Sequence, residues 1–441
     1  MAIHTFSLSE GTDIFSGTTL GVMSNLDARV QDLIRFIGAS PTSFHATVSL
    51  TERLETRGFT RLLMTDPWEE LPAQGFVVVD GSVIAWRTPR RWSSASTGLR
   101  VIASHTDSPA LKVKPNAGFD RFDSHQVGVE VYGGPQLHTW IDRDLCLAGR
   151  VVDIDGQVHM VHTQAFARVP GLAIHLDRGQ RENFHIDVAR DINVLISQVT
   201  AENGPIESVA SGVEPDRIAG HDLFFVPSEA PAVLGLGAEY LASYRQDNLL
   251  SVHAGLLGFL AAERSDAVQV YAAFDHEEIG SGTVTGASGS LLEHVLRRLS
   301  AGFGASMDAH LAWLARGVAV SADVAHGIHP SRPDVHDPMA HAVLNGGPVL
   351  KVNAQQRYAT DATTAAAWTI ACRDAKVPVQ TYANNSNILG GSSLGPLMAM
   401  RLGVRTVDVG VPVLGMHSVR ELCGIGDQKL FARAVEFFLA G

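Results

Sequence analysis

Continuous apolar runs alternate with helix-like segments along much of the chain, and this alternation constrains the fold more than any other feature. Residues 268–274 (VQVYAAF) and 317–322 (GVAVSA) are almost wholly apolar, as strands are when helices cover both faces of their sheet. Residues 249–262 and the alanine-rich residues 361–375 favour helices. We therefore predict an α/β fold with a mostly parallel sheet that is covered by helices on both faces.

Other segments extend the same rhythm. An Asp80-Gly81 turn between apolar residues indicates a hairpin over residues 76–85. Further strands are predicted over residues 99–104, 377–382 and 405–411, and further helices over residues 24–37, 43–57, 291–299 and 425–439.

The character of the sequence changes between residues 111 and 238, where short β-like runs and turns replace the alternation. The segment 169–177 is apolar and contains His175, and long connectors such as 200–221 are expected to be exposed. The β-like runs cover residues 127–132, 145–153 and 157–162. We predict an inserted β-rich domain over residues 111–238, which divides the main domain into residues 1–110 and 239–441.

The amino-acid composition argues against several classes of binding partner and indicates the cellular compartment. The net charge of −12 without a long run of one sign argues against nucleic acid or an anionic membrane as the main partner. The three cysteines are widely spaced, which argues against a disulfide framework and indicates a reducing, cytoplasmic location. No apolar stretch reaches the ~20 residues of a transmembrane helix. The first residues lack Lys, Arg and a long apolar run, so no signal peptide is expected.

Acid and histidine side chains follow several of the predicted strands or precede a helix. In open α/β sheets, sites form at the carboxyl ends of the strands, so we expect these side chains to converge. The segments are SHTDSP (104–109), RQDNL (245–249), DHEEIGSG (275–282), SADVAH (321–326) and GMHSVRE (415–421).

This set of side chains suits a site for two zinc ions. Zinc binds imidazole nitrogen and carboxylate oxygen, and a two-metal site needs a shared carboxylate and further ligands for each ion. In one arrangement that satisfies the count, Asp247 bridges, His105 and Asp323 complete one ion, and Glu278 and His417 complete the other. Cobalt or manganese could use the same ligands.

Other residues in these segments have two interpretations each. Glu277 is a general-base candidate beside a ligand, although Glu-Glu pairs are also common at solvated helix starts. Asp107 either orients the ring of His105 or caps a turn. His326 and His329 could be a ligand, a substrate contact or turn residues.

Several catalytic classes lack their signatures in this chain. DHEEIGSG is not an HExxH zinc motif, because Gly280 occupies the place of the second histidine. The glycine-rich segments 281–286 and 390–395 match neither a phosphate-binding loop nor a dinucleotide fingerprint, and the second more plainly opens a helix. No serine or cysteine stands in a nucleophile elbow.

Taken together, the segments resemble those of the M18 metallopeptidases, the aspartyl aminopeptidase family. The resemblance implies a zinc-dependent aminopeptidase that acts on peptides with a free N-terminus and prefers Asp or Glu there. It implies the same five metal ligands and gives Glu277 the role of general base. Further segments that carry the resemblance are FIGASPTSFHA (36–46), QVGVEVYGG (126–134), TWIDRDLCLAGRV (139–151), VPGLAIHLDR (169–178), RENF (181–184), SYRQDNLL (243–250), GPVLKVNAQQRYAT (347–360) and GSSLGP (391–396).

The resemblance also carries expectations about substrate and assembly. It implies substrate contacts at His326, Lys351 and Tyr358, and at His175, which would reach a neighbouring subunit's active site from the inserted domain. That domain is expected to form dimers, and the dimers a tetrahedral dodecamer. The chain departs from the family pattern before GSSLGP, where Asn387 and Gly390 replace an acid and a cysteine.

The resulting hypothesis is hydrolysis of an N-terminal peptide bond. A metal-activated water attacks the scissile carbonyl, and Glu277 takes its proton and passes it to the leaving amine. A related di-zinc deacylase or carboxypeptidase is one alternative, and a catalytically silent metal-binding assembly protein is the other.

Overall fold

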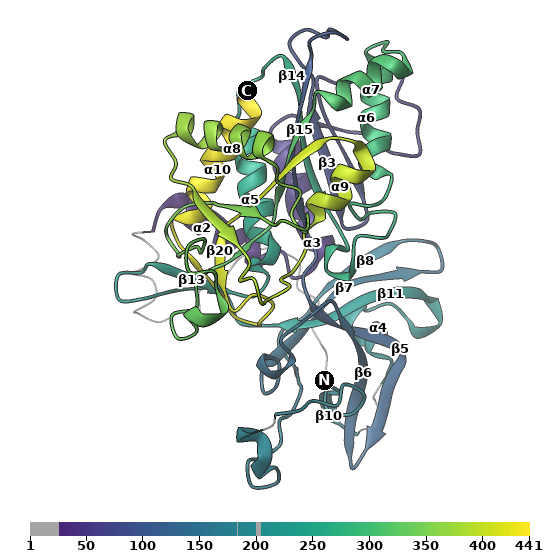
Figure 1. Ribbon diagram of the computed structural model, residues 1–441. Helices are drawn as coiled ribbons and strands as arrows, with labels where there is room; N and C mark the ends of the chain where they lie inside the picture. The colour runs from purple at the N-terminus through teal and green to yellow at the C-terminus, as the bar shows by residue number, and fades with distance from the viewer. Residues whose placement is uncertain (1–25, 183, 200–203) are drawn as a thin grey trace.

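The computed structural model describes residues 26–182, 184–199 and 204–441 (Figure 1). The prediction about a signal peptide concerns residues outside these ranges. In the described part of the chain, no helix combines the length and apolarity needed to cross a membrane.

A nine-stranded sheet forms the centre of the larger part of the molecule, with the order β1-β2-β3-β14-β4-β15-β19-β17-β18. The central strands β14, β4, β15 and β19 are parallel to one another. The pairs β2–β3, β3–β14 and β17–β19 are antiparallel, so the sheet is mixed. Its strands are β1 (Thr60–Arg61), β2 (Gln74–Val79), β3 (Ser82–Arg87), β4 (Gly98–His105), β14 (Ala267–Phe274), β15 (Val318–Ala322), β17 (Val349–Val352), β18 (Gln380–Ala383) and β19 (Arg405–Gly410).

Helices cover both faces of this sheet, and the predicted α/β architecture is confirmed. One face packs against α2 (Ala28–Gly38), α3 (Ser43–Thr56), α5 (Gln246–Ala261), α8 (Ala362–Ala375) and α10 (Asp427–Ala440). The other packs against α6 (Leu291–Gly302), α7 (Met307–Ala315) and α9 (Leu394–Leu402). Large side chains such as Trp368 and Trp313 are fully buried in these layers. Each buried side chain of this size contributes about 2–3 kcal/mol of hydrophobic stabilisation.

A second sheet lies below the first in Figure 1 and closes on itself, because β11 pairs with both β5 and β7. We call residues 110–227 the β-rich unit. It has its own core, which includes Trp140 and Phe225. Its strands are β5 (Ala110–Arg121), β6 (Ser124–Tyr132), β7 (Asp144–Asp153), β8 (Val158–His162), β9 (Ala167–Arg168), β10 (Val194–Gln198) and β11 (Ile218–Pro227), and its short helices are η1 (Leu137–Thr139), η2 (Arg178–Arg181), α4 (Ile206–Ser211) and η3 (Pro215–Arg217).

The expectation of an exposed connector over residues 200–221 is confirmed only in part for its described residues, most of which are exposed or half-buried. Helix α4 lies within it, and Ile206 of that helix is buried in the core of the β-rich unit. The apolar side chain anchors the segment, although its many polar neighbours conceal this in the sequence.

A small third sheet, which the sequence did not predict, has the order β12-β13-β21-β20-β16. Two further short helices are η4 (Glu277–Ile279) and η5 (Pro333–Val335). The loop between β20 and β21 contains His417, and β13 leads into α5. The strands are β12 (Ala232–Leu234), β13 (Tyr240–Ser243), β16 (Ala325–His326), β20 (Pro412–Leu414) and β21 (Glu421–Gly424).

Candidate metal centre

The register of the central sheet brings the polar strand ends together. Phe274 of β14 lies opposite His105 of β4, so that η4, which follows β14, is beside the 105–107 turn. Strand β15 pairs with the other edge of β4, with Ser321 opposite Ala103, which brings Asp323 to the same level. Asp247 enters from the first turn of α5.

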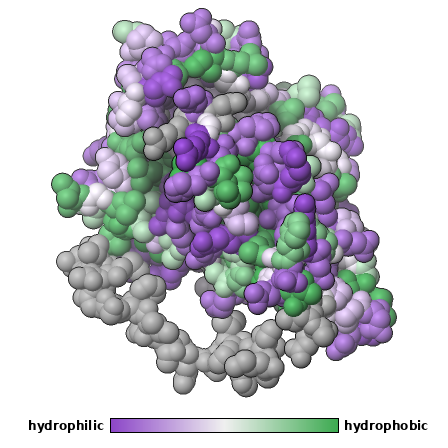
Figure 2. All heavy atoms as spheres, turned by 90° about the horizontal axis from the view of Figure 1, so that it is seen from below, coloured by the Kyte–Doolittle hydropathy of each residue, from purple (hydrophilic) through white to green (hydrophobic). Residues whose placement is uncertain are grey.

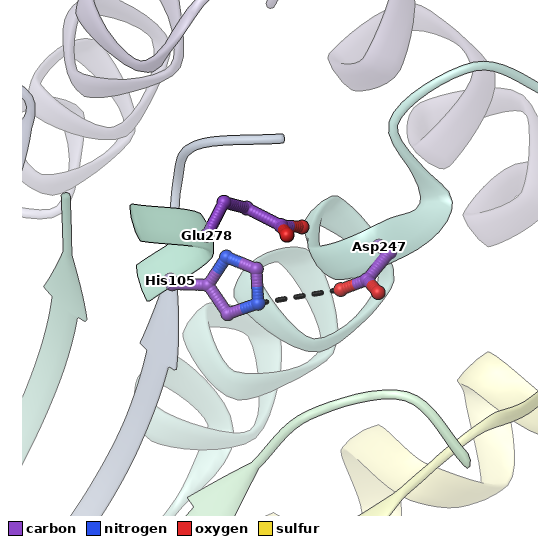
Figure 3. A group of neighbouring side chains, drawn as sticks. All are labelled: His105, Asp247 and Glu278. Carbon is purple, nitrogen blue, oxygen red and sulfur yellow. Dashed lines mark ion pairs between the residues drawn. The ribbon is translucent and has the colours of Figure 1, made fainter. Parts of the chain in front are cut away.

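The structure brings together all five residues that the sequence proposed as metal ligands. His105 Nε2 lies 3.3 Å from Asp247 Oδ1 and 3.6 Å from Asp323 Oδ1. His417 Nε2 lies 3.2 Å from Asp247 Oδ2 and 3.4 Å from Glu278 Oε2. The two oxygens of Asp247 therefore face different histidines. Figure 3 shows Asp247 and Glu278 converging on the ring of His105.

The chemistry of this group fits bound cations. Ligand atoms of His105, Asp247 and Glu278 all lie within 4.8 Å of one another. Among the described residues, Asp247 Oδ1 and Glu278 Oε1 are buried without a hydrogen-bond partner. Buried carboxylates that lack donors are costly unless a cation neutralises them. Nitrogen and oxygen donors in this mixture match the preferences of zinc.

The pKa shifts of Glu278 and His417 in the metal-free protein also indicate a site for a cation. Burial and the charge of Asp247 hold the pKa of Glu278 well above its usual range. Burial opposes protonation of His417, but the hydrogen bond to Asp247 and the charge of Glu278 raise its pKa to about 10. Both shifts favour protonation, which offsets part of the negative charge that a bound cation would neutralise.

Glu277 lies beside these ligands and lines the same cleft as Asp247 and Asp323. Burial, opposed by the positive charge of His105 and reinforced by the nearby carboxylates, raises the pKa of Glu277 to about 8. This pKa is that of the metal-free chain, and bound cations would lower it, which favours the ionised carboxylate that a general base needs.

Asp107 fixes the backbone of the two glutamates more than the ring of His105. Its oxygens accept hydrogen bonds from Glu277 N and Glu278 N, both at 3.1 Å, and from the Tyr132 hydroxyl at 2.8 Å. The carboxylate lies 3.4 Å from His105 Nδ1, while the main-chain oxygen of Asp107 lies closer, at 3.1 Å. The predicted orientation of the ring thus involves the backbone of Asp107 as well as its side chain.

Glu421 fixes the backbone of Asp247 and His417 in the same way, and sequence reasoning missed this residue. Its oxygens accept hydrogen bonds from Asp247 N at 3.0 Å and from His417 N at 2.7 Å. The side chain is fully buried. The only sequence signal was an acid at the end of the GMHSVRE segment, which already supplied a histidine ligand.

A cleft of about 820 Å³ opens from the candidate ligands. His326 lines it, and so do neutral polar residues such as Asn384 and Ser392. Arg332 also lines it, but its guanidinium is held by both oxygens of Asp334 at 2.9 and 2.8 Å.

The remaining predicted substrate contacts lie outside this lining. Lys351 is buried, and its ammonium donates to Asp323 O at 3.0 Å, Asp323 Oδ2 at 3.4 Å and Val324 O at 3.2 Å. Tyr358 is also buried, with Lys351 Nζ 5.0 Å from the centre of its ring. His175 is exposed between β9 and η2 in the β-rich unit.

Comparison with known proteins decides the family. Residues 36–439 match the family described as "Aminopeptidase I zinc metalloprotease (M18)". The chain belongs to the M18 family. A "Probable M18 family aminopeptidase 2" of Streptomyces coelicolor is 41% identical over 418 residues, which cover 92% of this chain and 96% of the relative. As a member of this family, the chain is a metalloaminopeptidase.

Solved structures agree with this M18 assignment. The fold matches a chain in "Cryo-EM structure of the Ape4 and Nbr1 complex" with a TM-score of 0.89 and 32% identity, covering 97% of this chain and 88% of that one. It also matches "Structure of S. cerevesiae mApe1 dodecamer" with a TM-score of 0.82 and 26% identity, covering 93% and 96% of the two chains.

Proposed function

We propose that this M18 chain is a di-zinc aminopeptidase that removes N-terminal residues from peptides with a free amine, with Glu277 as general base. The observation that carries the proposal is the position of Asp247, one oxygen of which faces His105 and the other His417. A carboxylate placed in this way suits a bridging ligand. His105 and Asp323 would hold one ion, and Glu278 and His417 the other.

Different groups at the site would perform different parts of the peptide hydrolysis. Zinc, when bound, polarises a carbonyl group and lowers the pKa of water toward ~7. Glu277 would remove the proton of the attacking water and deliver it to the nitrogen of the leaving peptide. Asp107 would hold the backbone of Glu277 during both transfers, through the 3.1 Å bond to Glu277 N.

We further propose the preference for N-terminal Asp or Glu that the family resemblance implied. Lys351 supports it only as a buried positive charge beside the site, because its ammonium is bonded to Asp323 and Val324 and does not reach the cleft. Burial would lower the pKa of Lys351, but the charge of Asp323 raises it on balance, so the cation persists at neutral pH. Two observations argue against a preference for Asp or Glu: Asn384 in the cleft lining is neutral, and Asn387 and Gly390 differ from the family pattern. The preference must therefore be measured separately from the activity.

We propose that residues 111–238 form a dimerisation domain and that dimers assemble into a dodecamer. The M18 relative mApe1 is described as a dodecamer. The segment around His175 exposes large apolar side chains, as interfaces do before assembly. Figure 2, seen from below, shows hydrophobic residues among hydrophilic ones on the face to which the β-rich unit contributes. The exposed side chains are Leu172, Ile174, Leu176, Phe184 and Val188.

The cytoplasmic location proposed from the sequence is supported by the cysteines. Cys146, Cys372 and Cys423 are all buried and unpaired. Free thiols of this kind are typical of proteins from reducing compartments.

The test is a metal-dependent cleavage assay. Protein stripped with a chelator and reloaded with zinc should cleave Asp-, Glu- and Leu-p-nitroanilide with a free amine, and the matched N-acetylated compounds should remain intact. N-acetylated peptides with a free C-terminal carboxylate, analysed by mass spectrometry, test the alternatives. Loss of the acetyl group alone would favour a deacylase, and loss of the C-terminal residue alone would favour a carboxypeptidase. Zinc binding without any cleavage would favour a silent assembly protein.

A further inference from the structure

The loop that carries His417 is attached to the β-rich unit by several hydrogen bonds. The segment 134–139, between β6 and β7, contributes these hydrogen bonds from the β-rich unit. Gly134 O lies 3.0 Å from His417 Nδ1, and Gln136 N donates to His417 O at 2.9 Å. The Gln136 amide Nε2 donates to Met416 O at 2.7 Å.

These contacts control which nitrogen of His417 faces the candidate metal centre. A carbonyl oxygen can only accept, so His417 Nδ1 carries the proton. Nε2, the atom 3.2 Å from Asp247 Oδ2, is then the nitrogen that loses its proton and offers a lone pair when a metal ion binds. Partners of this kind fix the tautomer and the ring orientation of metal-binding histidines.

The backbone of the loop needs this support, because His417 has a φ of 67°. Residues other than glycine adopt this left-handed conformation only where the surroundings hold them in it. Two hydrogen bonds hold the backbone of His417. In the main domain, His417 N donates to the Glu421 carboxylate at 2.7 Å, and in the β-rich unit, Gln136 N donates to His417 O. A further bond joins Val419 N to Thr139 Oγ1 at 3.1 Å.

We propose that Gln136 is a positioning residue for His417, and that the β-rich unit thereby completes one half of the metal centre within the same chain. Gln136 acts through the 416–417 backbone, because its side-chain amide is bonded to Met416 O. This role is separate from any contact between subunits. It rests on the proposed site for two zinc ions.

The test measures the two zinc affinities of the full-length chain by competition with a chromophoric chelator. Gln136→Leu removes the amide while keeping a side chain of similar size. It should weaken the binding of one of the two ions by about 10–100-fold, the usual effect of losing such a partner. The affinity for the other ion, held by His105 and Asp323, should be unchanged. In cobalt-loaded protein, the visible absorption spectrum of the affected ion should shift.

A second variant and a control protect the result against misfolding. Thr139→Val removes the acceptor of the hydrogen bond from Val419 N, and it should lower the affinity for the same zinc ion that Gln136→Leu affects. Gln164→Leu changes an exposed glutamine of the β-rich unit and should bind both ions as the unchanged protein does. Both affinities unchanged in Gln136→Leu and Thr139→Val would overturn the inference. If the unchanged protein itself binds fewer than two ions, the proposed function fails first, and this inference fails with it.

Discussion

Replacing the proposed general base, Glu277→Gln, should make the metal-free protein more stable and the zinc-loaded protein far less active. Burial and neighbouring carboxylates raise the pKa of Glu277 from 4.5 to about 8. The ionised carboxylate is therefore less stable in the folded chain than in the unfolded one. Each pKa unit corresponds to ~1.4 kcal/mol, so the cost of folding is on the order of 3–5 kcal/mol above pH 8.

The sign of the pH dependence follows from the raised pKa. Below pH 4.5 the carboxyl is protonated in both states and contributes no difference. The folded protein loses stability as pH rises from 4.5 through 8, because the unfolded chain releases the proton first. Glutamine has no proton to release, so the variant should lack this component of the loss.

Two measurements check the prediction. Denaturant unfolding in the presence of a chelator, at pH 5 and pH 8.5, should show a gain of a few kcal/mol for the variant at pH 8.5 and little at pH 5. Turnover of the zinc-loaded variant should fall by ~10²–10⁴-fold with its metal content intact. Glu55→Gln, at an exposed site of α3, serves as the control. Equal pH dependence in variant and parent, or full turnover in the variant, would refute the reasoning.

Three further outcomes are expected. Asp247→Ala should lose metal, measured by elemental analysis, and two zinc ions retained per chain would contradict the bridging role. Zinc binding should release protons near pH 7 and tighten as pH rises, because the pKa of His417, raised to about 10, leaves it protonated without metal, and the pKa of Glu278 is shifted in the same direction. Calorimetry in buffers of different ionisation enthalpy checks this, and proton uptake would contradict it. Gly410→Ala should lower stability by about 1–3 kcal/mol and weaken metal binding, because its Cβ would lie 1.8 Å from Asp323 O; unaltered thermal unfolding would show that this backbone yields.

Two properties could be predicted from the sequence because they are local. Apolar runs such as residues 268–274 report burial on both faces of a sheet, and the polar side chains that follow them report a strand end. Parallel strands place their carboxyl ends at one edge, so His105, Glu278 and Asp323 were expected to meet before their distances were known. The α/β architecture and the candidate ligand set followed from this reasoning.

Other features depend on contacts between distant residues. The third sheet joins β13 to β21, which are separated by most of the main domain, and its short strands carry no distinctive pattern. Lys351 was expected to face the substrate, but its three donors are bonded to Asp323 and Val324. The pattern of apolar and polar residues does not predict which acceptors a buried lysine will bond to.

The sequence by itself determined the fold class and the side chains that could bind zinc, because strand and helix periodicity and ligand chemistry can be read residue by residue. Only the tertiary structure decided how those side chains are held. Asp107 and Glu421 bind backbone N–H groups of four site residues, and Gln136 reaches the His417 loop from the β-rich unit. Nearly every residue carries a backbone N–H and C=O, so these bonds leave no mark in a sequence until the register of the fold selects them.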